Sequence, residues 1–282
     1  MKIISNKFIV ALFLSLLSSS AFADLNDADE MMMRATYKIQ CGNSLGTCFM
    51  VLVPSTNWHG LNYAILVTAK HVLASTTGTN ATIYLRPKNG NTFARKSFNV
   101  VLNSNGTNLW IGHPTADVAA LCIPPSSSDA EFFQHSFPSL NDLADDNFIR
   151  ERKVHPGDEV RVLGYPLGQE SSLAGFPILR SGRIASYPLV PTDLIQTYLL
   201  DFRVFNGNSG GPAYMCERRT LVEGSLESVN VFKIMGLISQ ESLVTETTSG
   251  LEEDYVHRYN LGIGVMVPAQ KITETIKLLN LK

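Results

Sequence analysis

Short apolar runs separated by Gly, Asn, Ser and Thr recur along most of the chain. In the first half they read ATYKIQCG, GTCFMVLV, YAILVTA, ATIYLRP, SFNVVLN and DVAALCIP. The second half repeats the pattern with DEVRVLGYP, PILRSGRIASYP, TYLLDFRV, GPAYMC, NVFKIMGLIS and LGIGVMVP. Runs of this length, bounded by turn-forming residues, are typical of strands in a β-sandwich or barrel. The pattern therefore predicts an all-β protein with two β-rich halves.

The pattern changes after Pro268, where Ile272, Ile276 and Leu279 follow one another at i, i+4 and i+7. This spacing puts the three side chains on one face of a helix, and proline suits a first helical turn. We expect a C-terminal amphipathic helix. A polar, acidic, proline-bounded segment at about 124–156 predicts a connector between the first half, about 34–123, and the second, about 157–282. Residues 24–33, DLNDADEMMM, predict a flexible lead-in.

The first 23 residues have the features of a cleaved export signal. Lys2 and Lys7 make the start positive, the run from Phe8 to Leu17 is apolar except for Ser15, and Ala21-Phe22-Ala23 offers a small-x-small cleavage site. The apolar run is far shorter than the roughly 20 residues of a membrane-spanning helix. We expect an exported bacterial protein, periplasmic or secreted, with no membrane anchor after cleavage.

Charge and cysteine content narrow the function classes. Cleavage would remove two lysines and no acid, which moves the formal net charge from −2 to −4. The seven Lys and Arg residues between Met31 and Ser128 are scattered rather than clustered, so no nucleic-acid surface is indicated. No Cys-x-x-Cys or His-x-x-x-His spacing occurs, which argues against a metal site. No cofactor is implied.

Four cysteines occur in the chain, and an exported protein can form disulfides. Their pairing cannot be read from the sequence. A bridge from Cys41 to Cys48 across a hairpin is one alternative, with Cys122 and Cys216 left unassigned.

The stretch FNGNSGGPAY centres on Ser209, which three glycines surround. Such a composition suits any tight turn, because glycine accepts positive φ at little steric cost. A serine hydroxyl becomes a nucleophile only when a base takes its proton, and the base needs an orienting acid. A functional interpretation of Ser209 therefore depends on partners elsewhere in the chain.

Two residues have contexts that suit those roles. His71 ends the apolar run ILVTAKHVL, although an ordinary strand-end histidine would look the same. Asp117 is the only acidic residue between Met31 and Ser128, and it directly precedes the apolar run VAALCI. A carboxylate at the edge of a core needs a partner to offset desolvation, or it caps its own turn in PTAD.

The motifs VTAKHV, ADVAAL and GNSGGP, in this order, resemble the trypsin-like (chymotrypsin-fold) serine peptidases. LGYPLG, SGRIAS and LGIGVMVP are similar to segments of the bacterial branch that includes the high-temperature-requirement peptidases. The resemblance extends from about Arg34 to the end of the chain. It implies two six-stranded antiparallel β-barrels followed by a C-terminal helix, with the site in the cleft between the barrels.

The resemblance also implies roles for individual residues. Ser209 would be the nucleophile, His71 the general base and Asp117 the acid that orients it, while the backbone N–H groups of Gly207 and Ser209 would form the oxyanion hole. The implied activity is that of a serine endopeptidase acting on a protein or peptide substrate through an acyl-enzyme. The natural substrate and the oligomeric state stay open.

The chain departs from the family's pattern at three positions. Asn208 stands where the digestive members carry an aspartate that pairs with a newly cut N-terminus, so activation by propeptide cleavage is not expected. Cys48 replaces the glycine of the GTGF pattern, and Val72 stands where the digestive members carry a cysteine that forms a disulfide beside the histidine.

The resemblance indicates three substrate-binding positions. The strand GLISQ makes Ser239 and Gln240 wall residues of the substrate site. Arg203 falls at the floor of the primary pocket, where a cation would favour acidic substrate side chains. The alternative is that Arg203 points to solvent or pairs with Asp201. The acidic segment from Thr245 to Arg258 predicts a loop beside the pocket.

Two other interpretations compete with a peptidase. Gly207 to Gly211 also fits the G-x-S-x-G elbow of α/β-hydrolases, with Asp254 and His257 following in the required order. Against it, the chain lacks alternating strand and helix segments. The second interpretation is a peptidase-fold protein that has lost catalysis and serves in binding or as an effector. An esterase acting through the same residues is a further alternative.

Overall fold

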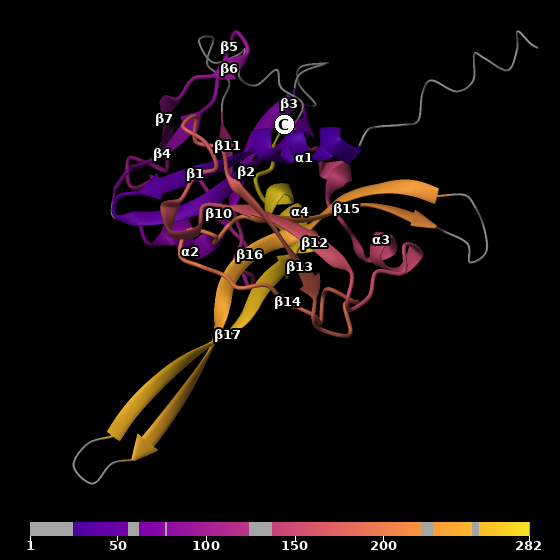
Figure 1. Cartoon of the computed structure of the whole chain (residues 1–282). Helices are drawn as coiled ribbons and strands as arrows, with labels where there is room; N and C mark the ends of the chain where they lie inside the picture. Colours follow the sequence, from indigo (N-terminus) through magenta and orange to yellow (C-terminus); the bar gives the residue numbers. More distant parts are fainter. Residues whose placement is uncertain are drawn as a thin grey trace, which may run out of the picture.

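The structure, a computed structural model, describes residues 25–55, 62–76, 78–123, 137–220, 228–249 and 254–281 (Figure 1). The predicted signal peptide at 1–23 and part of the predicted connector, residues 124–136, lie outside the described residues. The described chain forms two antiparallel β units and a few short helices. The predicted all-β, chymotrypsin-like class is therefore confirmed.

The first half forms one antiparallel sheet of seven strands, in the order β10-β11-β3-β2-β1-β4-β7. No ladder joins the outer strands β10 and β7, so this sheet curls without closing into the six-stranded barrel that the resemblance implied. Strand β10 has only two residues and pairs only with β11. The strands are β1 (Thr36–Cys41), β2 (Ser44–Pro54), β3 (Asn62–Thr68), β4 (Asn80–Leu85), β7 (Lys96–Val101), β10 (Ile111–Gly112) and β11 (Ala119–Ile123).

Two short hairpins extend from this sheet, formed by β5 (Lys88–Asn89) with β6 (Thr92–Phe93) and by β8 (Asn103–Ser104) with β9 (Thr107–Asn108).

The second half closes into a six-stranded barrel in the order β12-β13-β14-β17-β16-β15, as expected. Its register shifts between Ala213 and Tyr214 and again within the β16–β17 pair, marking β-bulges. The strands are β12 (Glu159–Gly164), β13 (Ile178–Ile184), β14 (Tyr198–Asp201), β15 (Pro212–Thr220), β16 (Ser228–Ser249) and β17 (Asp254–Pro268).

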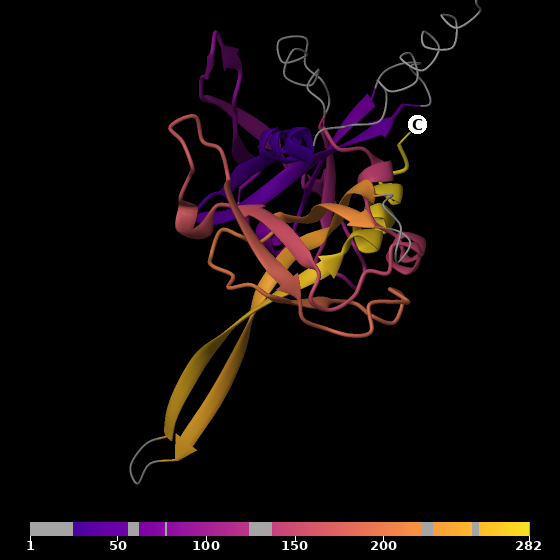
Figure 2. The same ribbon diagram turned by 45° about the vertical axis from the view of Figure 1, so that its right-hand side comes forward.

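Beyond Gln240, β16 and β17 continue as a two-stranded ribbon that projects away from the rest of the molecule (Figures 1 and 2). The register pairs Thr245 with Arg258 and Ser249 with Asp254, so most of the segment predicted as a loop is strand. The sequence there is rich in Thr, Val and Tyr, residue types that favour strands. The acidic composition had suggested a loop, but composition alone does not decide strand pairing.

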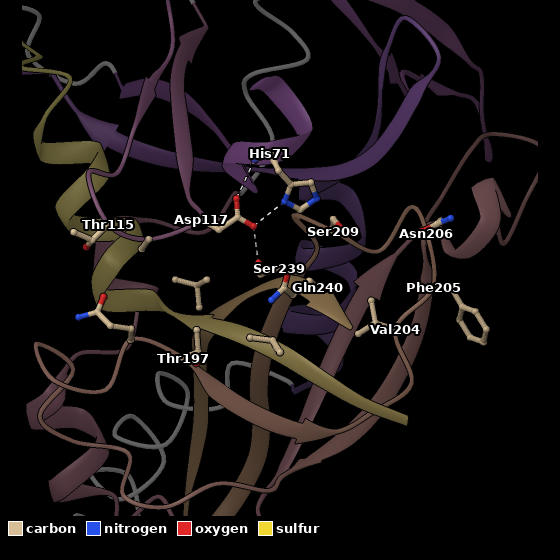
Figure 3. Close-up of a pocket in the computed structure, with 14 residues that line it drawn as sticks. His71, Thr115, Asp117, Thr197, Val204, Phe205, Asn206, Ser209, Ser239 and Gln240 are labelled. Atoms are coloured by element: carbon tan, nitrogen blue, oxygen red, sulfur yellow. Dashed lines mark hydrogen bonds and ion pairs between the residues drawn. The ribbon is translucent and has the colours of Figure 1, made fainter. Parts of the chain in front are cut away.

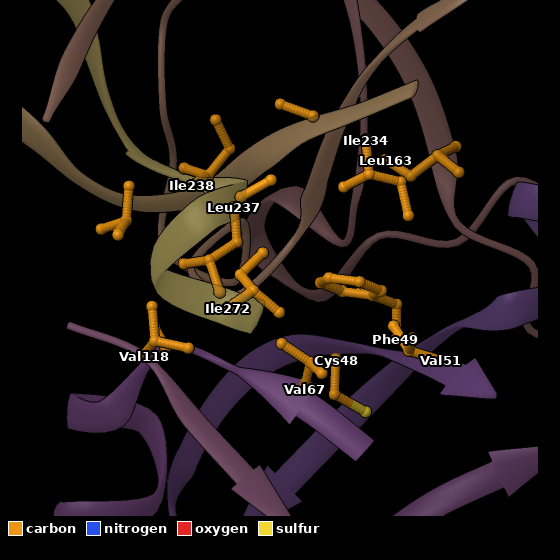
Figure 4. Packing of buried hydrophobic residues seen from close by; sticks show 14 of the residues in the cluster. Cys48, Phe49, Val51, Val67, Val118, Leu163, Ile234, Leu237, Ile238 and Ile272 are labelled. Carbon is orange, nitrogen blue, oxygen red and sulfur yellow. The ribbon is translucent and has the colours of Figure 1, made fainter. Parts of the chain in front are cut away.

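The helices are short. Besides α1, described below, they include α2 (Lys70–Ala74), α3 (Asp146–Glu151), α4 (Ala269–Lys277) and two 3-10 turns, η2 (Leu140–Asp142) and η3 (Pro166–Gly168). Within the described residues, no helix has the length and apolar character of a membrane span. The predicted C-terminal helix is confirmed as α4, and its Ile272 and Ile276 are buried. In Figure 4, Ile272 lies between Leu237 and Ile238 of the barrel and Val118 of the first half, so α4 joins the two halves.

Most of the predicted flexible lead-in, residues 25–33 of 24–33, instead belongs to helix α1 (Leu25–Ala35). Met32 and Ala35 are fully buried in the main core. Methionine is a good helix former, and burial of this apolar side supplies stability that a short helix lacks by itself. The polar start of the segment had suggested flexibility, whereas tertiary packing determines its structure.

The four cysteines form no disulfide. The β1–β2 register opposes Cys41 to Ser44 and Cys48 to Tyr37, so the suggested hairpin bridge does not join facing positions. Burial raises the pKa of the Cys41 and Cys48 thiols, which makes both poor nucleophiles.

We expect Ile272→Ala to lower the free energy of unfolding by about 2–5 kcal/mol, because it removes a fully buried side chain from between the two halves. Leu278→Ala, at a position 42% exposed just after α4, is the matched control and should change stability much less. Urea unfolding followed by circular dichroism measures both. Equal losses in the two variants would contradict a role for α4 as the joint between the halves.

Candidate active site

His71 is held at the edge of the first sheet by helix α2. The chain leaves β3 at Thr68, and α2 begins at Lys70. Val72 and Leu73 of α2 are buried, whereas the His71 side chain is 51% exposed. The buried neighbours thus fix the helix and leave the imidazole facing outward. The sequence predicts His71 at the end of a strand, whereas it lies on a short helix that begins two residues after β3 ends.

Asp117 lies between β10 and β11, directly before the fully buried Val118. Its Oδ1 accepts the backbone N–H of His71 at 2.9 Å, and its Oδ2 lies 2.7 Å from His71 Nδ1. The Ser239 hydroxyl donates to the same Oδ2 at 2.5 Å (Figure 3). The carboxylate therefore has the hydrogen-bonding partners that its place at the edge of the core required.

These contacts set the protonation states of the pair. Partial burial raises the pKa of the Asp117 carboxyl, but the hydrogen bonds from His71 and Ser239 outweigh burial and lower that pKa to about 2. Asp117 is thus an anion at neutral pH and can only accept hydrogen bonds. Nδ1 of His71 must then carry the proton, which leaves Nε2 of a neutral imidazole free to accept one.

Ser209 lies in a turn whose glycines are required by close packing. Gly207 and Gly210 have φ of +96° and +85°. A Cβ on Gly210 would lie 2.1 Å from the Thr47 carbonyl oxygen, and one on Gly207 would lie 2.2 Å from that of Tyr165. Any larger residue at either position would clash with backbone. The glycines of FNGNSGGPAY are therefore more than general turn formers.

Hydrogen bonds fix this turn to both halves of the molecule. Thr47 of β2 donates its N–H to the Ser209 carbonyl at 2.8 Å and its hydroxyl to the Gly207 carbonyl at 2.6 Å. Gly210 donates to the Ile238 carbonyl of β16 at 2.7 Å. The turn therefore bridges the first sheet and the barrel.

The backbone N–H groups of Gly207 and Ser209 donate no hydrogen bond within the described part of the chain. The Asn206 carbonyl accepts the Leu167 N–H at 2.7 Å. In a trans peptide the C=O and the following N–H point in opposite directions, so the Gly207 N–H is turned away from Leu167. Both predicted oxyanion-hole donors are thus available.

The His71 ring lies between Asp117 and Ser209 (Figure 3). No hydrogen bond joins His71 to Ser209 among the described residues, and such bonds are often long in the absence of substrate. All three residues line one pocket of about 610 Å³. It is also lined by Thr115, Ala116, Gln196, Thr197, Val204, Phe205, Asn206, Ser239, Gln240, Val265 and Val267.

Of the three predicted substrate-binding residues, two line the pocket and one does not. Ser239 and Gln240 line the pocket, as expected for wall residues. Arg203 does not line it: the residue is exposed, and its guanidinium carbon lies 5.1 Å from the centre of the Phe205 ring. Val204 and Phe205, the next two residues, take the place by the pocket. Residues 202–205 follow the end of β14 and belong to no strand, so the local loop conformation determines which of their side chains reach the pocket.

His113, which no sequence pattern singled out, holds the loop that carries Asp117. The ring is buried, with Nδ1 accepting the Ala116 N–H at 2.9 Å and Nε2 lying 2.9 Å from Glu274 Oε2 of α4. Its sequence neighbours are ordinary loop residues, so only tertiary contacts reveal it. The bond from Ser239 to Asp117 was also missed, because Ser239 had been assigned only to the pocket wall.

The α/β-hydrolase interpretation of the Ser209 turn is wrong. After Ser209 the chain enters the antiparallel strand β15, whereas the hydrolase elbow must lead into a helix beside a parallel sheet.

A metal centre is not indicated by the side chains either. Within the described residues, no three His, Cys, Asp or Glu side chains are grouped as a metal site would require.

Comparisons with known proteins were made by family model, by sequence and by structure. The family model described as trypsin-like peptidase domain matches residues 46–222. A search of curated proteins gave no match. Two crystal structures of the Rv3671c protease in an inactive form are similar: a serine-to-alanine mutant of the M. tuberculosis H37Rv protein, with a TM-score of 0.47, and a second with 0.46. Each is 20% identical and covers 93% of this chain; the chain in turn spans 95% and 98% of theirs.

We expect the stability of the protein to fall more steeply between about pH 4 and pH 2 than that of Asp117→Asn. The folded pKa of Asp117, about 2, lies below its ordinary value of 3.8, so its contribution is present above pH 4 and is lost as the carboxylate protonates in the folded state. Urea unfolding at a series of pH values measures the difference.

The matched control for this experiment is Asp201→Asn. Asp201 is exposed on β14 and has no side-chain hydrogen bond or ion pair in the described part of the chain. This variant removes the same charge and should keep the wild-type pH dependence. Parallel curves for wild type and Asp117→Asn would show that the His71–Asp117 pair is not formed in solution.

Proposed function

The chain belongs to the trypsin-like peptidase domain family, and we propose on that basis that it is an exported serine endopeptidase that uses Ser209, His71 and Asp117. The observation that carries the proposal is the hydrogen-bonded His71–Asp117 pair at the pocket that Ser209 also lines. His71 lies on α2, Asp117 between β10 and β11, and Ser209 in the turn before β15. A serine that only forms a turn would not require a hydrogen-bonded His–Asp pair at the same pocket.

The reaction follows from the protonation states of the pair. Ser209 Oγ attacks the scissile carbonyl carbon while His71 Nε2 takes the hydroxyl proton. Asp117 holds the tautomer that has Nε2 free, and its charge stabilises the imidazolium that forms. His71 then gives the proton to the departing amine, which leaves an ester on Ser209. Water attacks this ester with the same assistance from His71 and releases the acid.

The oxyanion of each tetrahedral intermediate is bound by the N–H groups of Gly207 and Ser209. Both donors are free of other hydrogen bonds in the described part of the chain, so they need not break a bond to bind the oxyanion. Donors that are fixed before the reaction cost no reorganisation when charge develops, and removing one such donor typically lowers kcat by about 10²–10³.

The pocket favours small or medium apolar substrate side chains. Val204, Val265 and Val267 contribute apolar walls, and Thr197 is neutral. Of the described residues, the charged or titratable ones lining the pocket are His71 and Asp117, which bind each other. A charged substrate side chain would lose hydration there without gaining an ion pair.

Export is supported by the sequence of residues 1–23. The positive start, the short apolar run and the Ala-x-Ala site are the features that secretion machinery recognises. Cleavage after Ala23 would release a chain that starts at Asp24, one residue before α1 begins.

We expect a fluorophosphonate probe to label the exported protein on Ser209, and intact mass should show a chain starting at Asp24. Ser209→Ala and His71→Ala should both lose labelling, because one removes the nucleophile and the other its base. Casein and ester substrates then separate a peptidase from an esterase. Absence of labelling in folded wild-type protein would favour a catalytically inactive binding or effector protein.

Peptides with Ala, Val or Leu before the scissile bond should be cleaved with kcat/KM at least about tenfold above those with Arg or Glu. Val265→Phe should narrow the pocket and lower kcat/KM for Leu more than for Ala. Arg203→Gln is the control and should leave the ranking unchanged, because Arg203 lies outside the pocket. A preference for Glu that Arg203→Gln abolishes would overturn this assignment.

A further inference from the structure

We infer that helix α1 sets the orientation of the oxyanion hole through two positioning residues, Arg86 and Tyr165. The inference rests on the proposed function, because the hole is assigned there. It concerns two residues that do not line the pocket: Arg86 follows β4 in the first half, and Tyr165 follows β12 of the barrel.

Arg86 is a buried cation, only 4% exposed, surrounded by oxygen acceptors. One terminal nitrogen donates to the carbonyls of Met33, Arg34 and Thr36, at 3.1, 2.9 and 2.7 Å. The other lies 3.3 Å from the Tyr165 hydroxyl and 3.1 Å from the Gly175 carbonyl. The guanidinium also lies over the rings of Tyr37 and Phe176, at 4.3 and 4.5 Å from their centres.

The charge of Arg86 has no carboxylate partner in the part of the chain that the structure describes. A buried charge is costly unless other groups compensate it. Here Met33 and Arg34 belong to the last turn of α1, whose free carbonyls carry the negative end of the helix dipole. The end of α1 therefore acts as the counter-charge, and Arg86 depends on the helix being docked.

The middle of α1 is fixed separately. Asp29 forms an ion pair with Arg161 of β12 and accepts the Tyr214 hydroxyl of β15 at 2.8 Å. Met32, on the next turn, is fully buried. The Asp29 contacts, the buried Met32 and the C-terminal carbonyls together hold α1 in one position across the two halves.

Tyr165 connects Arg86 to the segment that contacts the Ser209 turn. Its hydroxyl lies between Arg86, the Thr36 carbonyl and the Gly175 carbonyl, and its ring is fully buried. Its own carbonyl accepts the Gly168 N–H at 2.9 Å, which closes the turn 165–168. Within that turn Leu167, at φ +52°, donates to the Asn206 carbonyl.

The Leu167–Asn206 bond is the last link. It fixes the peptide between Asn206 and Gly207, and thereby the direction of the Gly207 N–H. The Tyr165 carbonyl also lies where a Cβ on Gly207 would be, so the two segments are in direct contact. If Arg86 no longer contacts the Tyr165 hydroxyl, the turn 165–168 can shift and the peptide between Asn206 and Gly207 can rotate. That rotation would turn the Gly207 N–H away from the oxyanion.

The first test is Arg86→Lys in the full exported chain. Lysine keeps the charge but lacks the planar fork, so it cannot bridge the α1 carbonyls and Tyr165 together. We expect kcat to fall by roughly 10–100-fold with KM within about threefold, because the oxyanion bond forms only in the transition state. Tyr165→Phe, which removes one oxygen atom, should lower kcat in the same way and covers the case in which Arg86→Lys fails to fold.

The matched control is Arg34→Lys. Arg34 lies on α1, but its side chain contacts Glu30 and the Phe93 ring rather than Tyr165. This variant should keep kcat within about twofold. In NMR spectra, Arg86→Lys and Tyr165→Phe should shift the amide resonance of Gly207 and leave the low-field Nδ1–H resonance of His71 in place.

An unchanged Gly207 resonance in both test variants, or kcat within about twofold of wild type, would overturn the inference. Simultaneous loss of the His71 signal would also overturn it, because that result indicates general loosening. The Gly207 resonance needs no turnover. A wild-type protein that is never labelled would therefore count against the proposed function, while the NMR comparison would still decide the coupling.

Discussion

The hydrogen bonds between Thr47 and the Ser209 turn are the constraint on which the rest of the site depends. Thr47 belongs to the first sheet, the turn leads into the barrel, and Thr47 is fully buried. Thr68 donates to the Thr47 carbonyl at 2.7 Å and so ties the strand that leads to His71 into the same contact. The backbone of Gly210 lies so close to Thr47 that no side chain fits between them. The two halves can therefore dock in only one way that keeps these bonds.

Once the first sheet and the barrel are packed together through Thr47, His71 and Asp117 are held in place by contacts close to them. Helix α2 holds His71, and Val118, the residue after Asp117, is buried in the core. Helix α4 reaches both halves, through Ile272 in the core and through Glu274, which contacts His113 beneath the Asp117 loop. The proposed catalytic groups thus lie where the first sheet and the barrel meet. Damage to the interface should impair catalysis even where each half stays folded.

The parts of the molecule that could be predicted from sequence are those fixed by local chemistry. Alternating apolar runs predicted the strands, and the amphipathic spacing after Pro268 predicted α4. The isolated acid Asp117 needed a partner and has one in His71. What was missed depends on contacts between distant segments. Helix α1 is polar at its start and is held by Asp29 and Met32 across the sheet interface. Arg203 lies outside the pocket, the alternative that the sequence left open, because residues 202–205 form no regular strand and their distance from Ser209 along the chain does not determine which side chain faces the pocket.

Asn208 and helix α1 both bear on how an N-terminal segment can stabilise the turn that carries Ser209. The Asn208 side chain is buried, and its Oδ1 accepts no hydrogen bond within the described residues. An uncharged amide at this position cannot anchor a newly cut ammonium group, so the turn needs support that does not wait for cleavage within the domain. The α1 carbonyls, acting through Arg86 and Tyr165, supply that support. Here the cation is Arg86, which follows β4, and the negative group is the C-terminal end of helix α1. In an ammonium–carboxylate pair the charges are the other way round, because the N-terminal segment carries the cation. Because a helix end needs no free amino group, this arrangement works wherever the chain begins upstream of α1.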